Sequence, residues 1–187
     1  MTVCGYDLIR SKRKTIGISV KPDGKVVVRA PFKAPSSDIE RFVQSNRDWI
    51  QRQQSKMLSI SRQAAQENPF TEEEICEMAE KAAKIIPERV GYYAKLIGVT
   101  YGRITIRNQK TRWGSCSGKG DLNFNCLLVL APPKVLDSVV VHELCHRKHM
   151  DHSAAFYAEV LRVFPDYYAH HDWLKKNVPV LIKRMTG

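Results

Sequence analysis

The chain has 187 residues, of which 43% are hydrophobic, and it carries a formal net charge of +11 at pH 7. This length and composition suffice for one sizeable core, so we expect a single globular domain over residues 1–187. No run approaches the roughly 18 apolar residues of a membrane-spanning helix, and the N-terminus lacks the apolar segment of a secretory signal, which argues against a membrane or secreted protein.

The first 30 residues alternate between apolar and polar side chains with the period of two that is typical of strands. Pro22-Asp23-Gly24 separates the last two apolar runs and is a typical turn sequence. We therefore predict a hairpin over residues 15–30. The alternating apolar residues are Tyr6, Leu8, Ile16, Ile18, Val20, Val26 and Val28.

Two helices are predicted next. Ser37 and Glu40 have the spacing of a capping box, and apolar residues then recur at helical spacing, which predicts one long basic helix over about residues 37–66. A second capping box at residues 71–74 begins another helix. Pro87 is expected to end or kink this helix, because proline cannot donate the backbone hydrogen bond of a helix interior, and a further helical turn is expected to run to Leu96.

In the second half of the chain, we predict two strands followed by three helices. Alternating apolar residues indicate strands over residues 103–107 and 121–130. A helix then begins near Ala131-Pro132-Pro133, and its apolar residues surround it almost completely, so it is expected to be buried. Further helices are predicted over residues 153–163, capped by Ser153, and over residues 172–184. The fold class is therefore expected to be α+β.

His142, Glu143 and His146 form an H-E-x-x-H motif on the predicted buried helix. Positions i and i+4 of a helix share one face, so the two imidazoles can bind one metal ion. Three polar groups on a buried face would otherwise each need a separate partner in a dry interior. The motif therefore predicts a metal site, whereas Cys145 between the ligands is interpreted as a small buried hydrophobe.

His152 is predicted to be the third ligand, and His149 is not. On a continuous helix His149 would lie about 10 Å along the axis from His142. Because metal–nitrogen bonds are about 2 Å long, three imidazoles in one straight row cannot converge on one ion. A turn at Met150-Asp151 would bring His152 to the site and leave His149 nearby, where it could support a ligand or face the substrate.

Three protein ligands leave a fourth position for water, which is the arrangement of catalytic rather than structural zinc sites. One Zn²⁺ ion, or another divalent metal ion, would lower the pKa of that water. Glu143 would then accept the proton as general base. The sequence therefore predicts a metal-dependent hydrolase.

The cysteines and the charge bear on compartment and partners. Five cysteines with no C-x-x-C pair argue against a disulfide framework and for a reducing cytoplasm. Residues 1–68 carry 13 Lys and Arg against 6 Asp and Glu, whereas residues 69–187 carry 17 against 13. This excess favours an anionic partner, including weak nucleic-acid binding through the basic N-terminal half. The alternative is a basic solvated surface, since no basic-aromatic motif accompanies the charge.

The chain resembles the YgjP-like metallopeptidase-type hydrolases, which are distantly similar to the SprT and WLM proteins. The resemblance covers essentially the whole chain, and the H-E-x-x-H helix is its central part. Asp151 precedes the third histidine here, where relatives often have Asn. The other matching segments are residues 13–16, Pro22-Asp23-Gly24, Arg112–Ser117, Asp151-His152-Ser153, Phe156, Pro165-Asp166-Tyr167 and Trp173-Leu174.

This resemblance implies a zincin-like catalytic domain with a small mixed sheet. It implies that the two helix histidines and His152 bind zinc and that Glu143 is the base. It also implies that the strand over residues 121–130 is an edge strand that can pair with an extended peptide substrate. The alternative is that the two asparagines of this strand, Asn123 and Asn125, merely face solvent.

Several further residues are candidates for contact with substrate. Arg112 is expected either to stabilise an oxyanion or phosphate near the metal or to anchor its loop. In the second case, the Trp113 side chain would pack into the core and Gly114 would form a turn. Tyr167 belongs to an aromatic and histidine cluster at residues 167–171, one member of which could donate a hydrogen bond to developing charge. Asp166 is expected either to accept the ring N–H of a ligand histidine or to cap a helix.

We therefore expect a cytoplasmic, zinc-dependent hydrolase of the metallopeptidase type that acts on peptides. Two alternative functions remain open. The first is hydrolysis of a nucleotide phosphoanhydride at the same metal site. The second is a nucleic-acid-associated binding protein that docks through residues 1–68. No membrane partner is expected.

Overall fold

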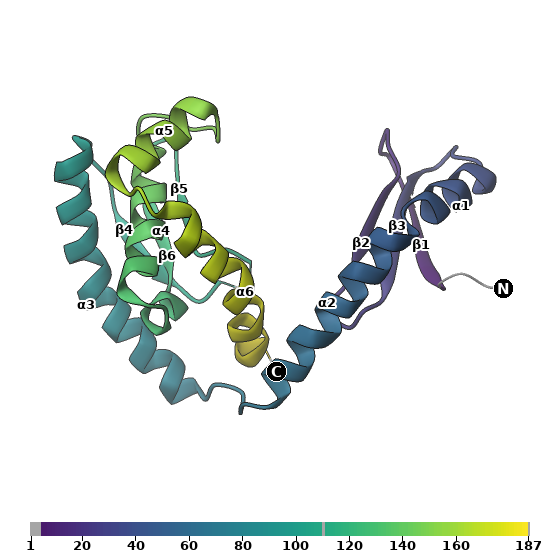
Figure 1. Ribbon diagram of the computed structural model, residues 1–187, viewed down its shortest axis with the longest axis horizontal. Helices are drawn as coiled ribbons and strands as arrows, with labels where there is room; N and C mark the ends of the chain where they lie inside the picture. Colours follow the sequence, from purple (N-terminus) through teal and green to yellow (C-terminus); the bar gives the residue numbers. More distant parts are fainter. Residues whose placement is uncertain (1–4, 110, 187) are drawn as a thin grey trace. The chain divides into compact units, whose positions relative to one another are not determined.

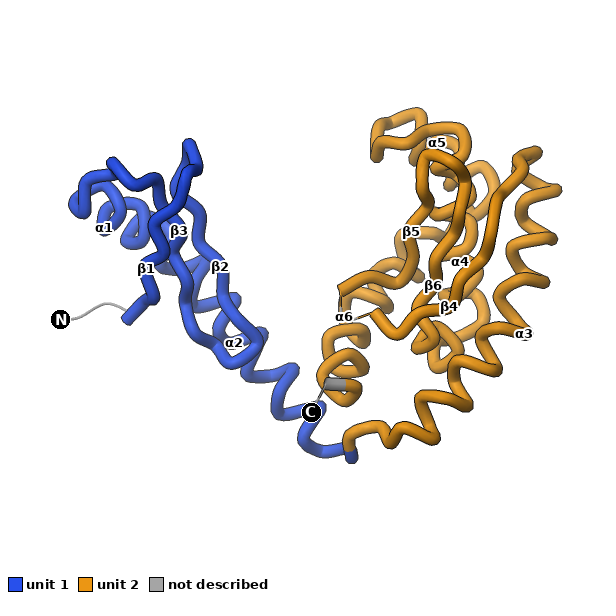
Figure 2. Tube along the Cα trace, turned by 180° about the vertical axis from the view of Figure 1, so that it is seen from behind, with its two compact units in different colours: residues 1–68 blue, residues 69–187 orange. Residues whose placement is uncertain are grey.

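The computed structural model describes residues 5–109 and 111–186 of the chain. These residues form two compact units, which divide between Asn68 and Pro69 (Figure 1; Figure 2). Each unit has its own three-stranded sheet and its own core. Helices combined with two small mixed sheets confirm the α+β class. Within the described ranges, no helix is both long enough and apolar enough to span a bilayer.

The first unit contains a mixed sheet in the strand order β1-β3-β2. β2 (Gly17–Val20) and β3 (Val26–Pro31) are antiparallel, which confirms the predicted hairpin, and β1 (Tyr6–Ser11) adds a parallel strand. Gly24 in the hairpin turn has a φ of 82°, a conformation that glycine adopts without a steric penalty. The buried residues of this unit are Val26, Val27, Val28, Ala30, Ile39, Val43, Ile50 and Ala64.

The prediction of one long helix over residues 37–66 is wrong. The segment forms α1 (Ser36–Ser45) and α2 (Arg47–Ala65), which are separated at Asn46. The side-chain amide of Asn46 donates a 2.7 Å hydrogen bond to the carbonyl of Phe42, which the backbone N–H of Asn46 would bond in a continuous helix. The predicted capping box at the start of α1 is also wrong, because no side chain caps that end.

The second unit begins with α3 (Glu72–Ile97), and its predicted capping box is confirmed. The hydroxyl of Thr71 accepts from the N–H of Glu74, and the carboxylate of Glu74 accepts from the N–H of Thr71 at 2.8 Å. The helix does not end at Pro87 but continues through it for ten residues. It ends at Gly98, whose φ of 78° is a typical C-terminal conformation.

The sheet of the second unit has the strand order β4-β6-β5. β4 (Ile104–Arg107) lies where it was predicted, whereas β5 (Gly114–Cys116) lies in a segment that was predicted to be a loop. β6 (Leu122–Asn125) pairs with β4 in parallel and with β5 in antiparallel orientation. Because β6 is the central strand, the expectation that it is an edge strand for a peptide is wrong.

The strand predicted over residues 121–130 is also too long, and Asn125 is the reason. Its side-chain oxygen accepts from the backbone N–H two residues on, which turns the chain into the 3-10 helix η1 (Cys126–Leu130). Its amide donates to the carbonyls of Gln109 and Arg112. Asn125 is fully buried and therefore does not face solvent, contrary to one of the two expectations for this strand.

Three helices complete the second unit. The predicted buried helix is confirmed as α4 (Pro133–Cys145), which contacts α3, α5, α6 and β5 (Figure 1). α5 (Ala154–Val163) begins after Ser153, whose hydroxyl caps it as predicted. α6 (Tyr167–Thr186) begins five residues before its predicted start, so the aromatic and histidine cluster is helical.

Candidate metal centre

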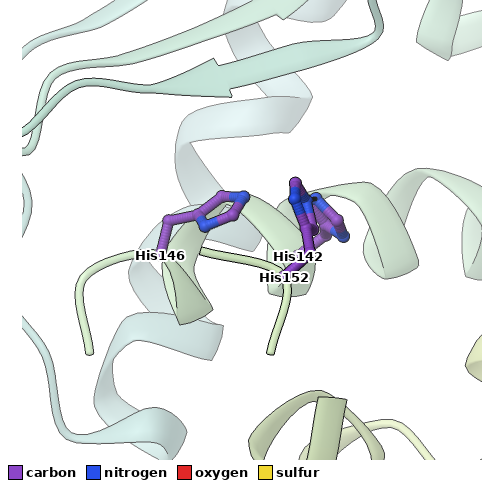
Figure 3. A group of neighbouring side chains, drawn as sticks. All are labelled: His142, His146 and His152. Atoms are coloured by element: carbon purple, nitrogen blue, oxygen red, sulfur yellow. Dashed lines mark hydrogen bonds between the residues drawn. The ribbon is translucent and has the colours of Figure 1, made fainter. Parts of the chain in front are cut away.

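Three histidine side chains converge at the C-terminal end of α4. His142 lies in the last turn of the helix, His146 is its C-cap residue, and His152 lies in the loop before α5. One ring nitrogen of each histidine lies within 4.8 Å of those of the other two. Nε2 of His142 is 3.1 Å from Nε2 of His152. Figure 3 shows the three side chains gathered at this end of the helix, close enough together to be candidate ligands of one metal ion.

The chain turns back between His146 and His152 because α4 stops. Two successive backbone N–H groups beyond the helix donate to the carbonyl of Cys145, which closes a tight turn. The carboxylate of Asp151 then accepts from the N–H of Ser153, and the hydroxyl of Ser153 caps α5. His152 is therefore held directly before the capped start of a second helix.

The outer ring nitrogens of the two helix histidines each have a partner. Nδ1 of His142 lies 2.9 Å from the hydroxyl of Tyr167, and Nδ1 of His146 lies 3.0 Å from the backbone carbonyl of His149. A carbonyl can only accept, so Nδ1 of His146 carries the proton and its Nε2 is free to bind a metal. Tyr167, and not Asp166, makes the contact with His142 that was expected of a supporting residue.

The donor set fits one divalent cation. Two nitrogens bound tetrahedrally to one zinc ion lie about 3.3 Å apart, which is close to the distance between the nitrogens of His142 and His152. Burial and the neighbouring imidazoles lower the pKa of His142 to about 3. Burial also lowers the pKa of His146. Both rings are therefore neutral at pH 7, as a metal ligand must be.

Glu143 points from α4 toward β5, and Gly114 makes room for it. A Cβ atom at Gly114 would lie 2.7 Å from both Cγ and Oε1 of Glu143, which is closer than real contacts allow. Glu143 is only 6% exposed. This burial raises the pKa of its carboxyl group to about 8, and the nearby charge of Arg112 partly opposes the shift. Gly114 is therefore a strand residue that accommodates the candidate base, and not the turn that was expected.

Two cavities meet at Glu143. The first, which we call the histidine cavity, has a volume of about 300 Å³ and contains all three histidines together with Cys116 on β5. The second, which we call the apolar cavity, has a volume of about 410 Å³ and lies between α4 and α6. Arg112, Gly114, His142 and Glu143 border both cavities. A group bound in either cavity would therefore lie beside the carboxylate.

The remaining candidates have different surroundings. The side chain of His149 is half-buried, and the contact of this residue with the site is through its backbone carbonyl. The side chain of Trp113 is partly buried and packs against the core, as predicted. Cys145 is fully buried, and burial raises the pKa of its thiol to about 12, which agrees with its interpretation as a small hydrophobe.

Two residues that contribute to the site could not be singled out from the sequence. Gly114 was not associated with Glu143, because the strand that carries it was predicted to be a loop. His171 was one of four equivalent candidates, and it is the member that lines the apolar cavity together with Tyr167. Its ring stacks on Tyr167 with a centroid distance of 5.5 Å. The early start of α6 brings both residues to the site, and no motif indicated that start.

The chain matches a known protein family. Residues 14–78 and 73–177 match the family described as "YgjP-like, metallopeptidase domain". These two segments overlap and together extend over most of the chain. A search among curated proteins finds no match.

Two solved structures of metallopeptidase zymogens are similar to part of the chain. Abylysin of Pyrococcus abyssi is 21% identical, with a TM-score of 0.47, over 50% of this chain and 95% of its own. Jannalysin of Methanocaldococcus jannaschii is 20% identical, with a TM-score of 0.46, over 51% of this chain and 98% of its own.

Proposed function

The chain belongs to the YgjP-like family of metallopeptidase domains, and on this premise we propose that it is a zinc-dependent peptidase with Glu143 as its general base. His142, His146 and His152 would hold the ion. The observation that carries the proposal is the convergence of three ring nitrogens within 4.8 Å beside a carboxyl group that is almost fully buried. Such a set of neutral imidazoles has its typical use in binding a divalent metal ion.

A bound divalent ion would supply Lewis acidity, which polarises a carbonyl group and lowers the pKa of water. Glu143 transfers the proton. The pKa of Glu143 is about 8 in the protein without a metal ion. A cation bound beside this carboxyl group would lower that pKa, because a nearby positive charge favours the ionised carboxylate. A carboxylate oxygen of Glu143 then accepts a proton from the attacking water and returns it to the amine that leaves.

Three other residues have distinct supporting roles in this proposal. The guanidinium of Arg112, at the border of both cavities, would stabilise the negative charge that develops on the substrate carbonyl oxygen. Tyr167 acts through His142, whose ring it orients. His149 acts through its backbone carbonyl, which fixes the tautomer of the His146 ring.

A peptide suits this site because β5 is an edge strand whose outer side pairs with no strand in the described part of the sheet. The carbonyl of Trp113 and the N–H of Ser117 bond toward β6. Because bonding alternates along an antiparallel pair, the backbone groups of Gly114 and Cys116 are directed away from β6. Both residues line the histidine cavity. An extended peptide that paired with them would therefore run past Glu143.

The decisive experiment replaces Glu143 with Gln and supplies zinc and an unfolded protein as substrate. We expect turnover to fall by about 10²-fold or more, the usual contribution of a general base, while elemental analysis still finds the bound metal. Glu77→Gln on the exposed face of α3 is the matched control and should be fully active. Wild-type turnover by Glu143→Gln would refute the assigned base.

The same proteins test the two alternatives. Release of phosphate from nucleoside triphosphates, dependent on Glu143 and without any peptide cleavage, would replace the peptidase with a nucleotide hydrolase. Nucleic-acid binding by the basic residues 1–68 predicts an affinity for DNA that falls steeply with salt. A lack of DNA binding at low salt would remove that alternative.

A further inference from the structure

The apolar cavity lies beside the candidate centre, and the proposed proton transfer does not use it. Its volume of about 410 Å³ lies in the range in which proteins bind small organic groups, about 300–1,000 Å³. Its walls come from the start of β5, from α4 and from α6. The apolar wall residues are Trp113, Val139, Leu174, Val178 and Pro179.

We propose that this cavity receives a large apolar side chain of the peptide substrate, next to the bond that is cleaved. The inference rests on the proposed peptidase function and names its substrate class. It follows first from position. Gly114, His142 and Glu143 border both cavities, so a side chain in the apolar cavity places its own backbone at the boundary where Glu143 lies.

The geometry of an extended peptide supports the same conclusion. Successive side chains of a strand point to opposite sides. A peptide that pairs with the free edge of β5 therefore directs alternate side chains toward and away from α4 and α6. Gly114 borders both cavities and has no side chain, so nothing from this position of β5 projects into either cavity.

The charges around the cavity select against a basic side chain. Lys175 and Arg112 line it, and Glu143 is the one acidic residue among the described lining residues. Lys175 forms an exposed ion pair with Asp172 at 3.3 Å, which keeps its charge near solvent. A substrate lysine would meet these cations, and any charged group in the apolar interior would lose its hydration without a partner.

The test compares the cleavage preference of two variants of α6 with that of the zinc-loaded wild type. Val178→Phe fills the cavity, whereas Val180→Phe places the same change two residues away, outside the lining. In a peptide library with one varied position, the wild type should prefer Phe, Leu or Met over Ala by at least about tenfold, since one methylene alone contributes about 10–200-fold. Val178→Phe should reverse this preference, and Val180→Phe should keep it.

A binding measurement separates this inference from the peptidase proposal. Glu143→Gln protein is titrated with peptides that carry Phe, Ala or Lys at the preferred position, with and without Val178→Phe. Tighter binding of the Phe peptide that Val178→Phe abolishes supports the inference even if no peptide is cleaved. Cleavage without side-chain preference, or equal behaviour of the two variants, overturns it while the peptidase proposal stands. Nucleotide binding that Val178→Phe blocks, without any peptide preference, also overturns it.

Discussion

The hydroxyl group of Tyr167 lies 2.9 Å from Nδ1 of His142, so α6 supports a candidate metal ligand on α4. Removing the hydroxyl leaves the ring nitrogen of a mostly buried histidine without this partner. We expect Tyr167→Phe to weaken metal affinity by about 10–100-fold, the usual effect of losing such a partner. Competition with a chromophoric chelator measures the metal affinity of each variant. Tyr168→Phe, at a position that is 54% exposed, is the control, and equal affinities of both variants would contradict the role of Tyr167.

Gly114 should tolerate no side chain without loss of activity. A Cβ atom there would meet Cγ and Oε1 of Glu143 at 2.7 Å, so Gly114→Ala should displace the carboxylate and lower kcat. The three histidines are untouched, so metal content should stay at the wild-type level. Gly118→Ala is the control because a Cβ atom there meets nothing within 4 Å. Full activity of Gly114→Ala would show that the Glu143 carboxylate need not lie where the structure has it.

The grouping of the three histidines could be predicted from the sequence where local spacing determines it. The pair of His142 and His146 follows from helix periodicity, and simple distances then exclude His149. The turn that brings His152 to the centre is also local, since it depends on the cap at Ser153. These residues needed no knowledge of tertiary structure.

The errors arose where a tertiary contact or a single side chain overrides a local pattern. Asn46 divides the long helix by donating a side-chain hydrogen bond to a backbone carbonyl, and Asn125 ends β6 by accepting one from the backbone N–H of Leu127. In both regions the apolar spacing continues across the break. The relation of Gly114 to Glu143 is of a different kind, because it joins a strand and a helix that are distant in sequence. No periodicity within either element could have indicated it.

Asp137 on α4 should be important for the stability of the second unit. It is 6% exposed, and its two carboxylate oxygens accept 2.6 Å hydrogen bonds from Arg89 on α3. Asp137→Asn would remove the charge that Arg89 pairs with. We expect a loss of about 2 kcal/mol in the free energy of unfolding, below the 3–5 kcal/mol of fully buried pairs because Arg89 is 38% exposed. Urea unfolding measures this loss, and Asp172→Asn in an exposed pair should cost little.

The pH dependence of stability should contain a contribution from Glu159. Hydrogen bonds from Arg162 and Lys148 lower the pKa of this carboxyl group in the folded protein to about 2 from a usual value of 4.5. Because the folded protein binds the proton more weakly than the unfolded chain, the stabilisation is complete above about pH 4.5 and is lost as the pH falls toward 2. The melting temperature of wild type should therefore exceed that of Glu159→Gln at pH 6, and the two should converge toward pH 2. Glu77→Gln, in which the replaced carboxylate is exposed, should follow the wild type throughout. A difference between wild type and Glu159→Gln that does not change from pH 6 to pH 2 would show that the ion pairs with Arg162 and Lys148 do not stabilise the fold.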